Sequence, residues 1–182
     1  MRFCTSLGSL DLNRWLEKSD AEEFLRANGA AAPVVSPASH GGSWSTLLRE
    51  GAGRQPAAGL ILEADHHGIE PQLLLTPGQI LLGVGSHVCA IRPSDWQLDW
   101  AHELDGPFYR FLCTPTDDTF VVVHELGAAK LTENGQVVWS WASFEIVSEV
   151  DFDTETLEIR GHDGARTSLD LATGRVKTES HD

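Results

Sequence analysis

The sequence predicts a mainly β protein, an antiparallel repeat sheet with a short N-terminal α-helical segment. From Leu60 onward, short apolar runs alternate with Gly, Pro, Asp and Asn at intervals of roughly eight to twelve residues, and no stretch between them is typical of a crossover helix. This region also aligns on itself with a period of about 40 residues. We therefore expect residues 1–29 to be a helical segment, 30–59 a linker or long loop, and 60–182 the antiparallel β-repeat domain.

The first part of the chain carries the helical pattern. Between residues 10 and 28, apolar side chains at helical spacing predict two short helices. These side chains are Leu12, Trp15, Leu16, Phe24 and Leu25. Ser19 and Glu22 have the spacing of a capping box, and Asn28-Gly29 suits a C-terminal cap. The Ala-, Pro-, Gly- and Ser-rich stretch that follows, up to Gly59, predicts the loop.

Three repeat units follow, starting at Ile80, Phe120 and Leu157. Each unit is predicted to be a strand, a tight turn, a second strand, another turn and a third strand. The first turns are expected at Gly85-Ser86, Leu126-Gly127 and Asp163-Gly164. A fourth strand is expected between units, at YRFLC and EIVSEV. Residues 60–78 either supply part of a fourth unit or leave three units as an open sheet or partial barrel, and the sequence favours neither.

The segment SLDLATGRV, residues 168–176, resembles the blade signature Ala-Leu-Asp-x-x-Thr-Gly-x-x-x-Trp of quinoprotein-type (PQQ-like) β-propellers. The resemblance implies that Leu169 packs between sheets, that Asp170 and Thr173 hold the turn, and that Gly174 takes a positive φ. It covers about three units between residues 79 and 178. Because even the smallest propellers have four blades, it implies a small or partial β-propeller-like fold without cofactor-dependent dehydrogenase activity, and we expect no cofactor.

The charge of the chain restricts its partners. Twenty-seven acidic side chains against thirteen basic ones give a formal net charge of −14, which repels nucleic acid and anionic membranes and favours a basic protein partner. Cys4, Cys89 and Cys113 form no C-x-x-C pair and no zinc-type cluster, so they are predicted to be reduced thiols. Because no apolar run reaches the length of a signal peptide or a membrane span, a cytoplasmic location is expected.

No catalytic constellation stands out. The chain contains no G-x-S-x-G elbow, no recognisable active-cysteine context and no glycine-rich phosphate loop, so we predict no catalytic or cofactor-binding residue. Asp65-His66-His67 has poor geometry for a shared metal, since two adjacent histidines in a strand point to opposite faces. This segment is predicted to be a hairpin turn that Gly68 completes. A small-ligand-binding or metal-binding enzyme remains the alternative, with its site at the mouth of the repeats near His87, His124 or His162.

Tryptophans recur along one edge of the repeats. The resemblance implies that Trp100 and Trp139 are core residues between blades. We predict that Trp96 or Trp141 is exposed inside an acidic rim, which is the composition of a protein-binding hot spot. The predicted partner-binding residues are Asp95, Trp96, Asp99, Glu103 and Trp141. The leading hypothesis is a non-catalytic module that binds a basic protein, for example an immunity protein that occludes a toxin. An assembly subunit is the third hypothesis.

Overall fold

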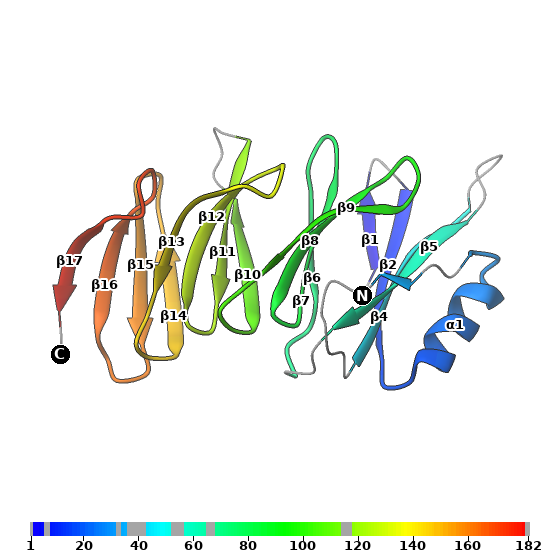
Figure 1. The fold of residues 1–182 in the computed structure, drawn as a ribbon, viewed down its shortest axis with the longest axis horizontal. Helices are drawn as coiled ribbons and strands as arrows, with labels where there is room; N and C mark the ends of the chain where they lie inside the picture. Colours follow the sequence, from blue (N-terminus) through cyan, green and yellow to red (C-terminus); the bar gives the residue numbers. More distant parts are fainter. Residues whose placement is uncertain are drawn as a thin grey trace. The chain divides into compact units, whose positions relative to one another are not determined.

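Strands dominate the fold and form four separate sheets (Figure 1). The computed structural model describes residues 2–5, 8–31, 34–35, 43–51, 57–64, 68–113 and 118–180. The chain divides into two units, residues 1–103 and residues 104–182, with two sheets in each. Among the described strands, all neighbouring pairs are antiparallel except β3 with β5, which confirms the prediction of a mainly β, antiparallel repeat protein.

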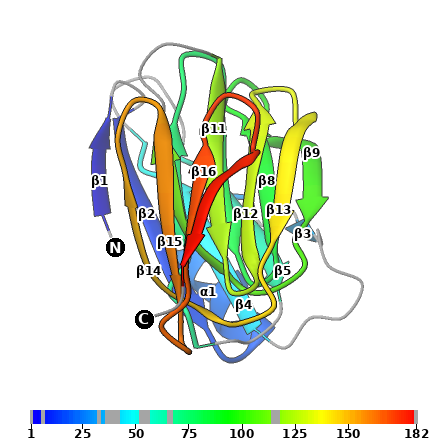
Figure 2. The ribbon, with the colours of Figure 1, turned by 90° about the vertical axis from the view of Figure 1, so that its left-hand side faces the viewer.

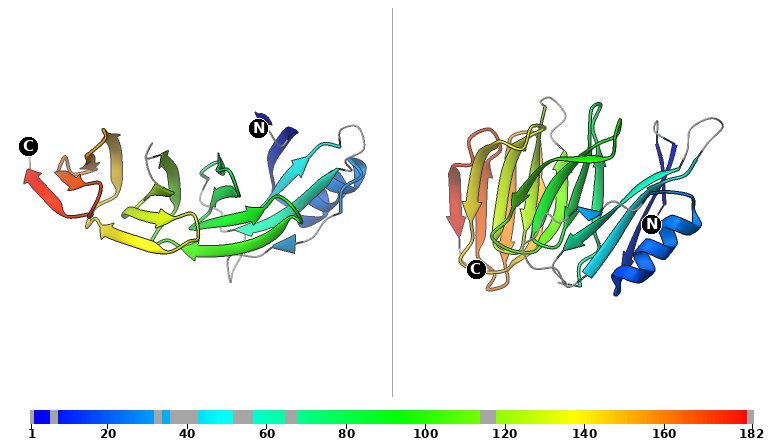
Figure 3. Two further views of the ribbon diagram at one scale, coloured as in Figure 1. Left: turned by 90° about the horizontal axis from the view of Figure 1, so that it is seen from above. Right: turned by 45° about the vertical axis from the view of Figure 1, so that its right-hand side comes forward.

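The first sheet of unit 1 is built from the N-terminal part of the chain, in the order β1-β2-β4-β5-β3. Its strands are β1 (Arg2–Thr5), β2 (Gly8–Trp15), β3 (Val34–Val35), β4 (Ser43–Arg49) and β5 (Ala58–Ala64). The single helix of the described residues, α1 (Lys18–Ala27), lies against β2, β4 and β5 (Figure 3). The strand β4 thus lies within residues 30–59, for which the sequence predicts a linker or long loop.

The prediction of a helix around Leu12 and Leu16 is wrong, because these residues belong to or follow β2. Leu12 pairs with Leu47 of β4 across an antiparallel ladder. Leu10 and Leu12, two residues apart, are both buried, whereas Leu16 is 74% exposed and cannot complete an apolar helix face. Burial with a period of two is the pattern of a strand, and pairing with a distant partner determines it here.

The second predicted helix is present as α1. It begins after Glu17, so Ser19 lies inside the helix and the predicted capping box does not form. Its C-terminal cap is as predicted. The backbone N–H groups of Gly29 and Ala30 donate back to carbonyl oxygens of the last turn, both at 3.0 Å, which is the Schellman arrangement.

Residues of β4 and β5 alternate between two cores. Leu48 and Ile61 face α1, where they pack with Ala21 and Leu25. The opposite face of this sheet packs on the second sheet of unit 1, whose strands are β6 (Gln72–Leu75), β7 (Ile80–Val84), β8 (His87–Arg92) and β9 (Gln97–Glu103). The buried residues of this shared core are Leu10, Leu12, Leu47, Leu60, Leu62, Ile80, Leu82, Cys89, Ile91 and Trp96. Residues 60–78 are therefore divided between two sheets.

Unit 2 contains two four-stranded meanders that follow the predicted repeats. The first has β10 (Phe108–Cys113), β11 (Thr119–His124), β12 (Gly127–Thr132) and β13 (Val137–Ala142). The second has β14 (Val147–Phe152), β15 (Thr156–Gly161), β16 (Arg166–Asp170) and β17 (Val176–Ser180), which lie side by side in Figure 2. The expected fourth strands are β10 and β14, the first strand of each sheet.

The predicted hairpin turns are close to the observed ones. Val84 pairs with His87, which confirms the two-residue turn at Gly85-Ser86. His124 pairs with Gly127, so the turn in the next repeat is Glu125-Leu126, one residue earlier than predicted. Asp163-Gly164 lies within the turn that joins β15 to β16, as expected.

The turn that follows β16 has the geometry that the sequence predicts. Oδ1 of Asp170 accepts hydrogen bonds from the backbone N–H and the hydroxyl of Thr173, both at 2.8 Å. These bonds, helped by Lys177, hold the pKa of Asp170 below its ordinary value. Gly174 has φ +69, and Leu169 is fully buried.

Trp139 fastens the two sheets of unit 2 to each other. Its indole is 7% exposed, and its Nε1–H donates to the carbonyl oxygen of Leu171 at 3.1 Å. The ring lies directly over Gly174, where an added Cβ would come within 2.7 Å of two ring carbons. The expected role of Trp139 as a core residue between sheets is confirmed.

Candidate protein-binding site

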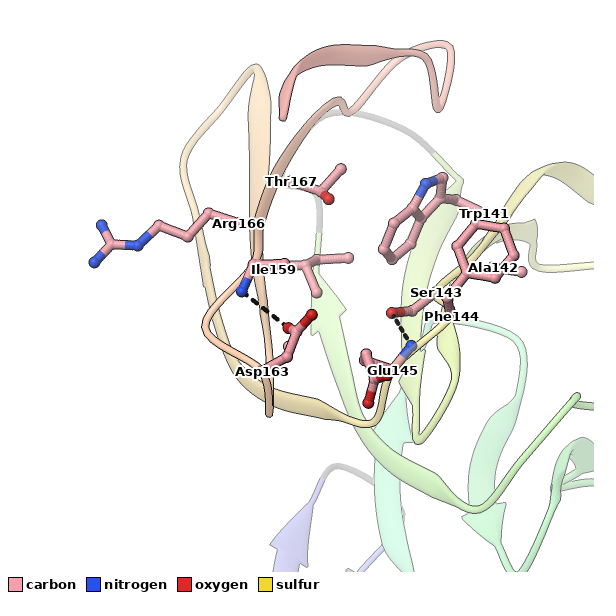
Figure 4. A pocket seen from close by; sticks show the side chains of 11 residues that line it. Trp141, Ala142, Ser143, Phe144, Glu145, Ile159, Asp163, Arg166 and Thr167 are labelled. Carbon is pink, nitrogen blue, oxygen red and sulfur yellow. Dashed lines mark hydrogen bonds between the residues drawn. The ribbon is translucent and has the colours of Figure 1, made fainter. Parts of the chain in front are cut away.

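A groove opens between the two sheets of unit 2, where the connection from β13 to β14 faces the β15–β16 hairpin (Figure 4). We call it the Trp141 groove, and its volume is about 180 Å³. It is lined by Trp141, Ala142, Ser143, Phe144, Glu145, Ile159, Gly161, Asp163, Ala165, Arg166 and Thr167. Every lining residue belongs to unit 2, so this unit provides the complete groove.

Two aromatic side chains form one wall of the Trp141 groove. Trp141 lies two residues after Trp139 on the same face of β13, and it is half-buried against the core of unit 2. Phe144, in the connection to β14, is 104% exposed and therefore gives its whole ring to solvent. Two hydrogen bonds hold the connection in place. The backbone N–H of Ser143 donates to the carbonyl oxygen of Leu126 at 2.8 Å, and the backbone N–H of Glu145 donates to the Ser143 hydroxyl at 3.1 Å.

The opposite wall comes from β15, β16 and the turn between them. Ile159, which is buried, and Thr167 point toward Trp141 (Figure 4). Asp163 lies in the turn, where its Oδ1 accepts a hydrogen bond from the backbone N–H of Ala165 at 2.9 Å. The side chain of Arg166 extends away from Trp141 (Figure 4). The wall is thus apolar in the middle and acidic at the turn.

The charge around the Trp141 groove is negative. Glu145 and Asp163 are both exposed, and neither forms an ion pair with any residue that the structure describes. Unit 2 contains fifteen Asp and Glu residues against six Lys and Arg, so it holds most of the acidic excess of the chain. The aromatic wall of Trp141 and Phe144, beside carboxylates that form no ion pair, favours a ligand that is partly apolar and positively charged.

The predicted acidic residues Asp95, Asp99 and Glu103 lie close together in unit 1. Asp99 and Glu103 point to the exposed face of β9, and Asp95 lies in the turn before this strand. The guanidinium of Arg92 lies 3.3 Å from Oδ1 of Asp95 and 3.8 Å from Oδ1 of Asp99. The side-chain amide of Gln79 donates a hydrogen bond to Oδ2 of Asp99 at 2.7 Å. Most of this predicted patch is therefore engaged with its own sheet.

Trp96 does not provide the exposed aromatic ring that we predicted beside these carboxylates. It is 6% exposed and packs in the core shared by the two sheets of unit 1, with Arg49 over its ring at 5.6 Å. Its φ is +60, and its backbone N–H donates to the carbonyl oxygen of Arg92 at 2.9 Å, as the backbone N–H of Gly174 donates to the carbonyl oxygen of Asp170 at 2.7 Å. The turn places a large residue where the later repeat has glycine, and this directs the ring inward.

The histidines considered for a metal site do not form one among the described residues. His87 and His124 are buried within strands β8 and β11, whereas His162 is exposed in a turn. In the described part of the chain, no group of three His, Cys, Asp or Glu side chains is placed to hold a metal ion. Burial raises the pKa of the Cys89 thiol to about 12, so this thiol is not an activated nucleophile. Asp65-His66-His67 lies outside the described residues.

Sequence reasoning found Trp141 but missed Phe144, Glu145 and Asp163. The available signal was the segment SFE at residues 143–145, a phenylalanine between polar residues in a connection where no strand needs it. Asp163 was predicted only as a turn residue. None of these could be joined to Trp141 before the packing of the two sheets was known.

Comparison with known proteins supports the fold. No protein-family model and no curated protein sequence matches the chain. The crystal structure of the computationally designed Ika4 protein is similar at 14% identity, with a TM-score of 0.51, over 65% of this chain and 76% of that one. The Pan2 WD40 domain of Neurospora crassa is similar at 15% identity, with a TM-score of 0.50, over 64% of this chain and 39% of that one.

These likenesses concern the fold alone, because the identities are low. Together with the four sheets they show a β-propeller-like repeat. No helix of the described residues is both long enough and apolar enough to cross a membrane.

Proposed function

We propose that this protein is a non-catalytic binding module that engages a basic protein partner through the Trp141 groove. The observation that carries the proposal is the full exposure of Phe144 beside the half-buried ring of Trp141 and the unpaired carboxylates of Glu145 and Asp163. Aromatic side chains that a partner can cover, surrounded by polar groups, are the usual composition of a binding hot spot.

Phe144 has no evident structural role, which supports a role in binding. Its side chain is fully exposed in the described part of the chain, and an exposed phenylalanine gains about 1.5–3 kcal/mol when another surface covers it. A connection held by backbone hydrogen bonds loses little conformational entropy on association. Covering Phe144 with a partner would therefore contribute most of this energy to affinity.

The acidic surface of unit 2 accounts for the proposed charge of the partner. Like-charged proteins and nucleic acids are repelled by it, whereas a basic surface is attracted and meets the groove faster. The acidic residues of β9 that the sequence singled out, Asp95, Asp99 and Glu103, form a second negative surface in unit 1. We propose that they add to this attraction, with Glu103 contributing most because it has no partner among the described residues.

A toxin that acts on nucleic acid is the specific partner that we propose, with the protein serving as its immunity protein in the cytoplasm. Carboxylates can replace the phosphates that such a toxin binds in its basic cleft, and steric occlusion would complete the inhibition. A quinoprotein-type origin of the repeats, supported by the turn at Asp170 and Gly174, is the finer family assignment that we propose.

Affinity capture with matched variants tests this proposal. The tagged protein is incubated with a lysate of its source organism at low and moderate salt, and the retained proteins are identified by mass spectrometry. We expect a basic protein to be retained in a salt-sensitive manner. Phe144→Ser should reduce retention of this protein at least about tenfold. Loss of a hot-spot residue typically costs about 2 kcal/mol or more of binding free energy, and each 1.4 kcal/mol is about a tenfold change in Kd.

Leu16→Ser is the control for this substitution, since Leu16 is an exposed apolar residue of unit 1 that lies far from the groove in sequence. It should leave retention unchanged. Equal loss with both variants, or retention of acidic proteins only, contradicts the proposed function.

A further inference from the structure

The Trp141 groove has the size of a single side chain. Sites for drug-sized ligands usually enclose about 300–1,000 Å³, whereas this groove encloses about 180 Å³. It is also partly open to solvent, because Phe144 on its border is fully exposed. A projecting residue of a partner therefore fits the groove better than a cofactor or a metabolite does.

We propose that this residue is an arginine, whose guanidinium stacks on Trp141 and is bound by the carboxylates of Glu145 and Asp163. The inference rests on the proposed function, and it names the group of the basic partner that enters the groove. Trp141 offers the aromatic face, and a cation over tryptophan is the strongest of the cation–π pairs. Ile159 offers an apolar surface for the methylene stem of the side chain.

The positions of the two carboxylates support a bound cation. Figure 4 shows Glu145 and Asp163 at the same end of the groove, on opposite walls. Asp163 uses Oδ1 for the bond to Ala165, and no described residue binds its Oδ2. The resident cation Arg166 extends away from Trp141 and leaves this end of the groove to a ligand.

Arginine suits the site better than lysine for physical reasons. The guanidinium is planar and weakly hydrated, so it stacks on an aromatic face and still donates to two carboxylates in its plane. An ammonium group is more strongly hydrated and cannot stack. We therefore expect the groove to bind arginine more tightly than lysine, and to bind citrulline, the neutral isostere, far more weakly.

The test uses a small probe and the whole protein. The indole N–H of Trp141 gives one NMR signal, which the Trp141→Phe variant identifies by its loss. N-acetyl-arginine amide is titrated into the labelled protein, with the citrulline and lysine amides as comparisons. For a ligand of this size the expected Kd for arginine is on the order of 1 mM.

We expect the Trp141 signal to move saturably with arginine, less with lysine, and not with citrulline at the same concentrations. The Glu145→Gln/Asp163→Asn variant should weaken arginine binding at least about tenfold, because two charge-assisted hydrogen bonds are lost. Asn keeps the oxygen that accepts from Ala165, so the turn is preserved. The control Asp153→Asn/Glu158→Gln removes the same charge from another turn and strand, and should change nothing.

An unmoved Trp141 signal at 20-fold the expected Kd overturns the inference, as does an equal response to citrulline. Equal weakening by the control variant would assign the effect to net charge and also overturn it. These outcomes can be separated from failure of the proposed function. If Phe144→Ser still abolishes capture of a basic protein while arginine amide does not bind, the proposed function stands and only the arginine is wrong.

Discussion

Gly174 lies at the closest contact between the two sheets of unit 2, and replacing it with alanine measures that contact. With φ +69, an L-residue at this position costs about 1–2 kcal/mol through its own backbone conformation. The new Cβ would also lie 2.7 Å from Cγ and Cδ2 of Trp139 and 2.9 Å from its Cβ. The ring cannot move freely, because its Nε1–H is bonded to Leu171. Overpacking of this kind costs about 1–3 kcal/mol, so Gly174→Ala should destabilise unit 2 by about 2–5 kcal/mol.

Gly164→Ala separates the two parts of this cost. Gly164 has φ +86 in the turn between β15 and β16, and an added Cβ there meets no atom within 4 Å. It should therefore cost only the conformational part, about 1–2 kcal/mol. A urea titration that is monitored through the NMR signals of residues 104–182 reports the unfolding of unit 2 by itself. The difference between the two variants is the cost of the contact with Trp139.

A double-mutant cycle with Trp139→Ala completes the test. Without the ring, Gly174→Ala should cost less by about 0.5–3 kcal/mol, the range found for residues in direct contact. Equal costs for Gly174→Ala and Gly164→Ala, or a coupling of zero in the cycle, would refute the reasoning that Trp139 fastens the two sheets over this glycine.

Two further predictions concern the equivalent turn in unit 1 and the acid stability of unit 2. Trp96→Gly relieves about 1–2 kcal/mol of backbone strain but removes a buried indole that contributes about 3–5 kcal/mol to stability. Urea titration should therefore show a lower free energy of unfolding. Increased stability would contradict the packing of Trp96 in the core. The lowered pKa of Asp170 adds stability above the ordinary aspartate value of 3.8 and loses it as the pH falls through the lower folded value. Asp170→Asn should therefore flatten the fall in stability below about pH 4, and an unchanged pH profile would exclude this contribution.

The sequence predicted the parts of the fold that depend on local interactions. The turn at Asp170 and Thr173 forms through hydrogen bonds within four residues, and its residue types are legible wherever they occur. The cap at Gly29 is local in the same way. The repeats were predicted because successive hairpins need the same apolar alternation and the same turns, which makes their period visible in the chain itself.

The N-terminal sheet was not predicted because its pairing is not local. Leu12 pairs with Leu47 through a ladder that connects residues 35 positions apart, and the segment between them contains a helix and residues with few strand signals. Leu12 and Leu16 also satisfy helical spacing, so the pattern fits both periods. Only the exposure of Leu16 and the burial of Leu10 distinguish a strand from a helix, and neither can be read from the sequence.

Of the residues that line the Trp141 groove, the sequence singled out Trp141 as a binding residue but not Phe144 or Glu145, for a related reason. The sequence predicted an aromatic residue inside an acidic surface, but the exposure of Trp96 and that of Trp141 could not be ranked by sequence, since both adjoin polar residues. Their difference comes from backbone direction. A φ of +60 directs Trp96 into the core, whereas Trp141 lies at the end of β13, where the sheet opens and its ring is only partly covered.

The two acidic surfaces also differ in how strongly they can bind a cation. We expect the Trp141 groove to bind a cation more tightly than the surface formed by Asp95, Asp99 and Glu103 does. Arg92 and Gln79 already satisfy Asp99, so a partner must displace them, and the net gain from an exposed pair exchanged in this way is close to zero. Glu145 and Asp163 have no such competitor among the described residues, and they adjoin the aromatic and apolar surface of the groove, which would shield a bound guanidinium from part of the solvent. Partial desolvation strengthens each charge–charge contact there. Removing Glu145 and Asp163 should therefore weaken partner binding more than removing Asp95 and Asp99, although each pair carries the same charge.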